Sequence, residues 1–228
     1  MAGNPFPKPA TLVDEVAAIS IDAATRPWAS RGGLKLDSAL ESFHLEVSGC
    51  RCLDVGASTG GFTDVLLHRG AGSVVAVDVG YGQLDWRLRS DPRVTVRDRL
   101  NFRFADPAEL GAPFDLVTMD VSFISVALLA GGLAACGAPG TDYVVLVKPQ
   151  FEVGREQVGR GGLVTDPALH VEAVARVAGA LDSEGIGVLD VCLSAIKGAT
   201  GNQEFFLHGR TAAARALGDE ALVAVVAP

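Results

Sequence analysis

The stretch LDVGASTGGFTDVLLHRGAGSVVAVDVGYGQ, from Leu53 to Gln83, restricts the possible folds more than any other part of the chain. A short apolar run ends in Asp54, and a turn that contains glycines follows it. A segment with helical periodicity then leads to a second apolar run, which ends in Asp78. This order is typical of a βαβ unit, in which a crossover helix joins two parallel, buried strands. We therefore expect an α/β fold.

Strand-like and helix-like segments continue to alternate along the 228 residues. This alternation predicts a mainly parallel, seven-stranded sheet with helices on both faces. The last two strands have no long helix between them, so we expect them to pair antiparallel at one edge. Strands are predicted over 51–55, 73–78, 93–97, 114–120, 142–149, 186–196 and 202–210, and helices over 30–43, 62–69, 83–88, 123–135 and 166–183.

The composition supports one large domain, since 49% of the residues are hydrophobic. The net charge of −8 means that any contact with nucleic acid would need a local basic patch. The four cysteines lack the spacing of a metal site, so we expect no metal and free thiols in the cytoplasm. The uncharged segment 121–141 contains several glycines, which favours a buried helix and loop over a membrane span, and no secretory signal is visible.

Four side chains with possible chemical roles fall at the carboxyl ends of predicted strands. They are Asp54, Asp78, Asp120 and Lys148. Ligands of open parallel sheets bind beyond these strand ends. Residue type and position therefore agree in predicting a ligand site at this edge of the sheet.

The turn after the first strand reads Gly-Ala-Ser-Thr-Gly-Gly from Gly56, and Ser58 replaces the second glycine of a dinucleotide-binding pattern. No P-loop is present either. Asp78 is well placed to accept hydrogen bonds from ribose hydroxyls, but the loop lacks the glycines that would bind a pyrophosphate. This combination favours a ligand that contains adenosine without a diphosphate. S-adenosylmethionine fits that description. Asp54 could then orient its amino-acid end and Asp98 could accept from the adenine amine, although Asp78 and Asp98 could also be ordinary loop acids.

Lysine is scarce, and two of the four lysines occupy positions suited to chemistry. Lys148 ends a strand, and Lys35 follows the Arg-Gly-Gly turn. Unlike arginine, lysine can lose its proton near neutral pH when it is desolvated or crowded by another cation. Asp120 and Glu204, the latter placed in the last predicted strand, could converge with them at one mouth of the sheet. A surface cluster of ion pairs without chemistry is the alternative.

Several motifs resemble the TlyA family of FtsJ-like ribosomal-RNA 2′-O-methyltransferases, whose members are often called haemolysins. They are SRGGLKLDSAL, CLDVGASTGGFTDVLL, AVDVGYGQLDWRLRSDPRV, DVSFIS, VKPQFEVGREQVGRGGLVTDP and IKGATGNQEFFL, and they span about 28–208. The resemblance implies a Rossmann-like class I fold that uses S-adenosylmethionine. It places the family's catalytic tetrad on Lys35, Asp120, Lys148 and Glu204. The predicted cofactor set is Asp54, Gly56, Ala57, Ser58, Gly60, Phe62, Asp78, Asp98, Asn101 and Asp120.

The resemblance also implies domains and partners. We expect residues 1–28 to be the remnant of an S4-like RNA-binding module with its linker, residues 29–210 to form the methyltransferase domain, and residues 211–228 to form a C-terminal helix or tail. The expected partner is ribosomal RNA or a ribosomal subunit, with no membrane contact. The expected reaction holds a ribose 2′-hydroxyl in line with the sulfonium methyl group while Lys148 accepts or steers its proton.

Three alternatives remain open at this stage. The substrate could be a small hydroxylated molecule, the protein could act on membranes as a haemolysin, or it could bind the cofactor without catalysis. Arginines could provide a phosphate-binding surface, although nearby aspartates could neutralise them. They are Arg87, Arg89, Arg93, Arg97, Arg99, Arg103, Arg155 and Arg160.

Overall fold

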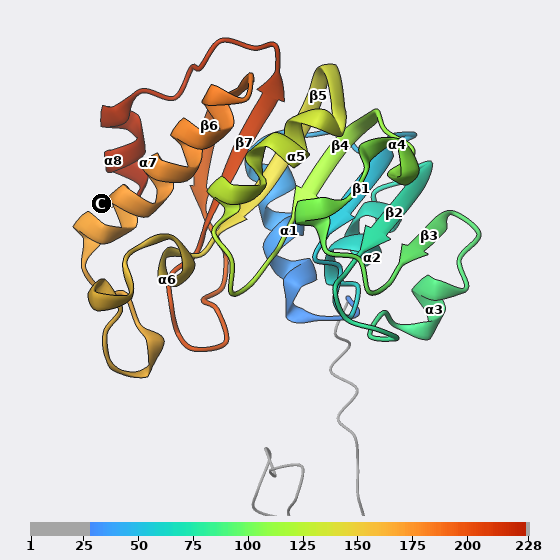
Figure 1. The fold of residues 1–228 in the computed structure, drawn as a ribbon, viewed down its shortest axis with the longest axis horizontal. Coiled ribbons are helices and arrows are strands. Elements are labelled where there is room, and N and C mark those ends of the chain that lie inside the picture. Colours follow the sequence, from blue (N-terminus) through green and yellow to red (C-terminus); the bar gives the residue numbers. More distant parts are fainter. Residues whose placement is uncertain (1–27, 227–228) are drawn as a thin grey trace, which may run out of the picture.

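The computed structural model describes residues 28–226, so the predicted S4-like remnant lies, except for Trp28, outside the described residues. The described chain forms a seven-stranded sheet in the order β3-β2-β1-β4-β5-β7-β6 (Figure 1). This confirms the predicted fold class. The strands are β1 Arg51–Val55, β2 Ser73–Val77, β3 Val94–Arg97, β4 Phe114–Met119, β5 Gly137–Val147, β6 Ile186–Leu193 and β7 Phe205–Thr211.

The sheet is parallel from β3 to β5, and β7 pairs antiparallel with both β5 and β6. The predicted antiparallel edge is therefore confirmed. The chain moves outward from β1 through β2 to β3 and then returns to pair β4 with the other side of β1. This reversal creates a crevice at the carboxyl ends of β1 and β4, where open sheets bind their ligands.

Helices and short 3₁₀ turns cover both faces of the sheet. The α-helices are α1 Arg31–Ser42, α2 Gly61–His68, α3 Trp86–Arg89, α4 Pro107–Leu110, α5 Ala130–Ala135, α6 Pro149–Glu152, α7 Pro167–Ser183 and α8 Asp219–Val226. The 3₁₀ turns are η1 Phe102–Phe104, η2 Val126–Leu129, η3 Arg155–Gln157 and η4 Arg160–Gly162. Within the C-terminal segment 211–228, residues 219–226 form α8.

The sequence pattern explains where the two longest helices begin. In α7, the Asp166 carboxylate accepts a hydrogen bond from the backbone N–H of Ala168 at 2.9 Å, and Pro167 is the first helical residue. Aspartate at the cap and proline at the first helical position are typical of a helix start. In α1, Ser30 caps the helix and Leu36 and Leu40 are buried. The apolar face of α1 is therefore turned towards the core.

Several predicted bounds differ from the structure. The helix predicted over 83–88 is the short α3, Trp86–Arg89, and the helix predicted over 123–135 begins three residues later, with the 3₁₀ turn η2 followed by α5. Phe123 has a left-handed backbone (φ +65°), which no helix can include, and Ser125 caps η2 instead. Glu204 was placed inside the last strand, but β7 begins one residue later at Phe205. Its carbonyl oxygen still accepts a hydrogen bond from Ser194 N–H at 2.9 Å.

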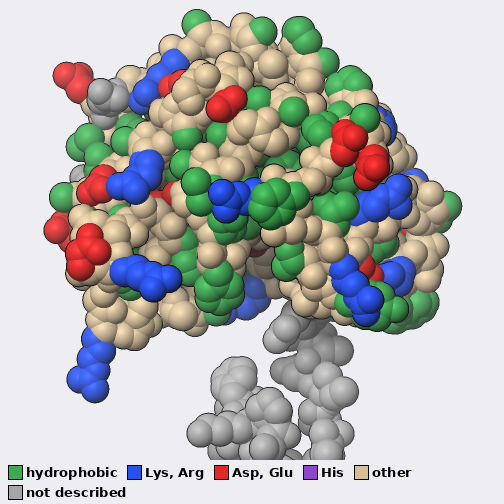
Figure 2. Space-filling view, viewed as in Figure 1, with side chains coloured by type: hydrophobic (Ala, Val, Ile, Leu, Met, Phe, Trp, Pro, Cys, Tyr) green, Lys and Arg blue, Asp and Glu red, His purple; other side chains and the backbone are tan. Residues whose placement is uncertain are grey.

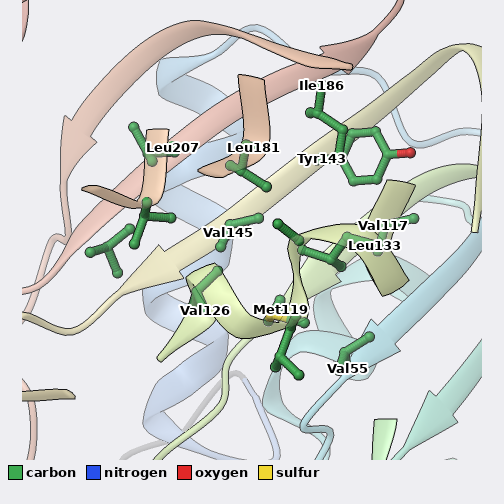
Figure 3. Packing of buried hydrophobic residues seen from close by; sticks show 14 of the residues in the cluster. Val55, Val117, Met119, Val126, Leu133, Tyr143, Val145, Leu181, Ile186 and Leu207 are labelled. Carbon is green, nitrogen blue, oxygen red and sulfur yellow. The ribbon is translucent and has the colours of Figure 1, made fainter. Parts of the chain in front are cut away.

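The core forms two layers, one on each face of the sheet. On one face α5, α7 and α8 cover the sheet, and Figure 3 shows Leu133 of α5 and Leu181 of α7 beside the strand residue Val145. On the other face α1 and α2 pack over the alternate residues, including Val144 and Leu146. Strand side chains alternate between the faces, so both layers rest on the same rigid strands.

The uncharged segment 121–141 folds into η2, α5 and the beginning of β5. Within residues 28–226, no helix has both the length and the apolar character that crossing a membrane requires.

Candidate active site

Three adjoining hollows open at the crevice beside β1 and β4, and each is named here by one lining residue. The Asp78 hollow has a volume of about 340 Å³, and the Arg31 and Lys148 hollows about 450 Å³ each. Asp120 lines both the Asp78 and Arg31 hollows, and Lys35 lines both the Arg31 and Lys148 hollows. The shared residues make the three hollows one continuous site.

The turn between β1 and α2 lines both the Asp78 hollow and the Arg31 hollow. Gly56 has a left-handed backbone (φ +86°), and a Cβ there would collide with the carbonyl oxygen of Asp120. Gly60 (φ +98°) directly precedes α2 as its N-cap and lines none of the three hollows. Ala57 and Phe62 line the Arg31 hollow. The predicted loop therefore lies at the site, with Gly60 shaping the turn rather than facing the hollow.

Asp78 directly follows β2 and faces the Asp78 hollow. Its Oδ2 accepts a hydrogen bond from the backbone N–H of Ser58 at 2.8 Å, and its Oδ1 accepts one from Gly80 N–H at 2.7 Å. Each carboxylate oxygen can accept a further bond. The acid is thus held in a fixed orientation and can still receive two neighbouring hydroxyl groups.

Asp54 lies inside β1 rather than at its end, and its exposed fraction is 0%. Thr63 Oγ1 donates to its Oδ2 at 2.6 Å, and Thr118 Oγ1 donates to its Oδ1 at 3.3 Å. Burial, and to a smaller extent the charge of Asp120, raises the pKa of Asp54 to about 7. The expected contact with the cofactor's amino-acid end does not fit this position, because the carboxylate bridges α2 and β4 below the site.

Asp98 and Asn101 follow β3, and the structure separates them. Asp98 lines none of the three hollows and pairs with Arg89 at 2.6 Å, and this hydrogen bond lowers the pKa of the Asp98 carboxylate. Asn101 lines the Asp78 hollow, and its side chain accepts from Arg103 N–H at 3.1 Å. The structure therefore brings Asn101 to the site, whereas Asp98 orders the neighbouring loop.

The four residues of the predicted tetrad form two ion pairs. Lys148 Nζ lies 2.5 Å from Asp120 Oδ1, and Lys35 Nζ lies 2.5 Å from Glu204 Oε2. Both lysines are 9% exposed. Lys35, Lys148 and Glu204 line the Lys148 hollow together, and Asp120 lines the two hollows beside it. The structure thus gathers side chains from four distant segments around one opening.

Sequence reasoning missed three residues of this site. Ser122 accepts a hydrogen bond from Lys148 Nζ at 2.9 Å. Arg31 and Lys197 line the Arg31 hollow, and Arg31 Nη2 donates to the carbonyl oxygen of Lys197 at 3.0 Å. The DVSFIS motif and the count of four lysines were visible signals, but neither indicates which atoms meet. In the part of the chain that the structure describes, no group of His, Cys, Asp or Glu could hold a metal ion.

Comparison with known proteins adds family relationships to this geometry. The family model described as FtsJ-like methyltransferase matches residues 28–211. The 16S/23S rRNA (cytidine-2′-O)-methyltransferase TlyA of Mycobacterium tuberculosis is 50% identical over 221 residues, which are 96% of this chain and 82% of that protein. The 23S rRNA (cytidine-2′-O)-methyltransferase TlyA of Campylobacter jejuni is 32% identical, covering 83% of this chain and 74% of that protein.

Solved structures agree with this relationship. A protein described as a hemolysin from Streptococcus thermophilus has a TM-score of 0.84 and 42% identity, covering 88% of this chain and 73% of that one. The magnesium protoporphyrin IX methyltransferase of Synechocystis, solved with S-adenosylmethionine bound, has a TM-score of 0.55 and 11% identity, over 79% of this chain and 78% of that one. The second likeness concerns the fold alone.

Proposed function

Because this chain belongs to the FtsJ-like methyltransferase family, we propose that it transfers the methyl group of S-adenosylmethionine to ribose 2′-hydroxyls of ribosomal RNA. The observation that carries the proposal is the pairing of Lys148 with Asp120 beside two hollows that suit the cofactor. Relatives named as rRNA cytidine-2′-O-methyltransferases supply the substrate class. An enzyme with such a substrate would act in the cytoplasm.

The Asp78 hollow suits adenosine. Asp78 offers two oriented oxygens to ribose hydroxyls, and apolar side chains such as Leu100, Phe102 and Ile124 form walls for the adenine ring. The Arg31 hollow suits the amino-acid end, because Arg31 and Lys197 would attract its carboxylate. When bound, the cofactor would supply an electrophilic methyl group. Gly56 and Asp120 line both the Asp78 and Arg31 hollows, so they would lie beside the sulfonium.

The contacts of Lys148 fit a proton acceptor. To accept a proton, Lys148 would react from its neutral form, in which the amine has two N–H donors and one lone pair. Nζ donates a hydrogen bond to Ser122 and lies 2.5 Å from Asp120 Oδ1, beside the Lys148 hollow. A ribose 2′-hydroxyl placed there would give its proton to Lys148 while its oxygen attacks the methyl group. Holding the hydroxyl in line would provide much of the acceleration.

The second ion pair would shape the same pocket. Lys35 reaches across from α1 to Glu204, whose exposed fraction is only 2%. The cationic end of Lys35 would attract the ribose-phosphate backbone of the target nucleotide and bring it towards Lys148. Glu204 would hold Lys35 in that direction and balance its charge.

An arginine-containing surface near α3 and β3 supports an RNA substrate. Figure 2 shows Lys and Arg side chains gathered with hydrophobic ones at the corner where Figure 1 places these elements. Arg99 lies over the Tyr81 ring at 4.2 Å, and Arg103 lies 5.7 Å from the Phe104 ring. Arg89 and Arg93 instead pair with aspartates. Part of the arginine set is therefore neutralised, and part is available for phosphate and base contact.

Incubation with ribosomal subunits and labelled S-adenosylmethionine tests the proposal. We expect wild-type protein to label ribosomal RNA, and Lys148→Ala to lower the rate by about 10²- to 10⁴-fold with little change in cofactor affinity. Retained transfer in Lys148→Ala would refute the assigned role. Activity on RNA should fall steeply between 50 and 200 mM salt. Methylation of small hydroxylated molecules that is indifferent to salt would favour the alternative substrate class.

A further inference from the structure

Glu152 is a buried carboxylate that the proposed mechanism does not use. It ends α6, four residues after Lys148, and is 3% exposed. Ser125 Oγ donates a hydrogen bond to Glu152 Oε2 at 2.5 Å, and the backbone N–H of Val126 donates to Oε1 at 2.8 Å. Both donors belong to the connection after β4, whereas Glu152 belongs to the connection after β5. Its carboxylate therefore ties together the two segments that follow the catalytic strands.

Between Asp120 and Ser125 the chain forms a short arch, residues 121–124. One end is fixed because Asp120 N–H donates to the carbonyl oxygen of Val55 at 2.9 Å. The other end is held by the two hydrogen bonds to Glu152. At the middle, Phe123 has a left-handed backbone (φ +65°) and is 92% exposed. A bulky residue in this conformation is strained, so it persists only where its surroundings fix it.

The arch carries functional contacts. Ser122 accepts the hydrogen bond from Lys148 Nζ, and both Ser122 and Phe123 line the Asp78 and Lys148 hollows. The arch is thus the wall between the proposed cofactor position and the proposed substrate position. If the arch moved away, Lys148 would lose the Ser122 acceptor and the wall would open.

We propose that Glu152 is a positioning residue for methyl transfer, which clamps the 121–124 arch so that Ser122 orients Lys148. The inference rests on the proposed function for its catalytic consequence. Its structural part, the clamp, stands on the two hydrogen bonds alone. Glu152 touches neither the substrate nor the cofactor hollow, because it lines none of the three hollows.

Three variants separate this role from a general contribution to folding. Glu152→Ala removes both acceptors. Glu152→Gln retains the clamp, since its carbonyl oxygen can accept from Val126 and its amide can donate to the Ser125 hydroxyl oxygen. Glu109→Ala is the matched control, because Glu109 is an exposed acid that lines none of the hollows. Each variant is assayed per mole of S-adenosylmethionine bound, so that unfolded molecules do not count.

Hydrogen exchange across residues 120–128 and steady-state kinetics are then measured on the same preparations. We expect Glu152→Ala to speed exchange in this segment and to lower kcat by about 10- to 100-fold, with cofactor affinity within about threefold of wild type. Glu152→Gln should recover kcat to within about fivefold, and the control should match wild type. If Glu152→Ala does not fold, Ser125→Ala compared with Glu152→Gln carries the same test.

An unchanged kcat in Glu152→Ala, or a Glu152→Gln variant as impaired as Glu152→Ala, would overturn the inference. The exchange measurement keeps the two proposals distinguishable. A wild-type protein that binds S-adenosylmethionine without methylating ribosomal RNA would overturn the proposed function, while slow exchange in wild type and fast exchange in Glu152→Ala would still establish the clamp.

Discussion

Replacing Asp54 with asparagine should stabilise the protein in a strongly pH-dependent way. Burial raises the pKa of this carboxyl from its ordinary value of 3.8 to about 7 in the folded protein. Between these values the unfolded chain releases the proton while the folded chain retains it, so stability falls as pH rises. At about 1.4 kcal/mol per pH unit, the full interval corresponds to about 4 kcal/mol. Above pH 7 the folded protein carries this cost as a buried charge.

Asparagine resembles the protonated acid in shape and cannot ionise. Its carbonyl oxygen can accept from Thr63, and its amide can donate to the Thr118 hydroxyl oxygen, so the bridge between α2 and β4 remains. The free energy of unfolding in urea, measured for both proteins from pH 4.5 to 8, should shift in favour of Asp54→Asn by about 3 kcal/mol over that range. Glu109→Gln, at an exposed position, is the control. A difference between variant and wild type that stays constant with pH would refute the reasoning.

Three further predictions concern single contacts of the site. Asp78→Ala should weaken S-adenosylmethionine binding at least tenfold in calorimetry, because hydrogen bonds to a charged group are worth about 1.5–3 kcal/mol each; unchanged affinity would contradict the ribose role. Gly56→Ala should lower the melting temperature and cofactor affinity together, since a Cβ would collide with Asp120; a neutral effect would show that the turn can shift. Glu204→Gln should lower kcat more than cofactor affinity in methyl-transfer assays, because Lys35 loses its charged partner; an effect on cofactor binding alone would contradict this.

The sequence predicts the parts of this fold that depend on local patterns. Apolar runs mark the strands, and Asp166-Pro167 marks the start of α7. Positions at strand ends also agree with the structure for three residues of the candidate site, since Asp78, Asp120 and Lys148 each directly follow a strand. These features are predictable because they follow from the period of a strand, the geometry of a helix cap and the topology of a parallel sheet.

Contacts between distant segments could not be predicted in this way. Ser122 and Glu152 are ordinary polar residues in the sequence, and their roles arise because the connections after β4 and β5 lie side by side. The helix predicted through Phe123 fails for the same reason. Apolar composition favours a helix there, but tertiary contacts hold Phe123 in a left-handed conformation. The 3₁₀ turn η2 therefore begins only at Val126. Long-range hydrogen bonds outweigh local propensity at the site.

Asp54 and Asp120 are similar acids, in β1 and directly after the neighbouring β4, but one holds the turn and the other pairs with Lys148. The side chain of Asp120 is 22% exposed and pairs with Lys148, whereas Asp54 is fully buried and held by two threonines. The charge of Asp120 itself disfavours ionisation of Asp54. A neutral Asp54 can anchor the turn without competing for Lys148, because an uncharged carboxyl adds little to the field at the ion pair. Ionisation of Asp54 at alkaline pH would place a second negative charge beneath the turn, so the anchor and the ion pair are coupled through electrostatics as well as through the backbone.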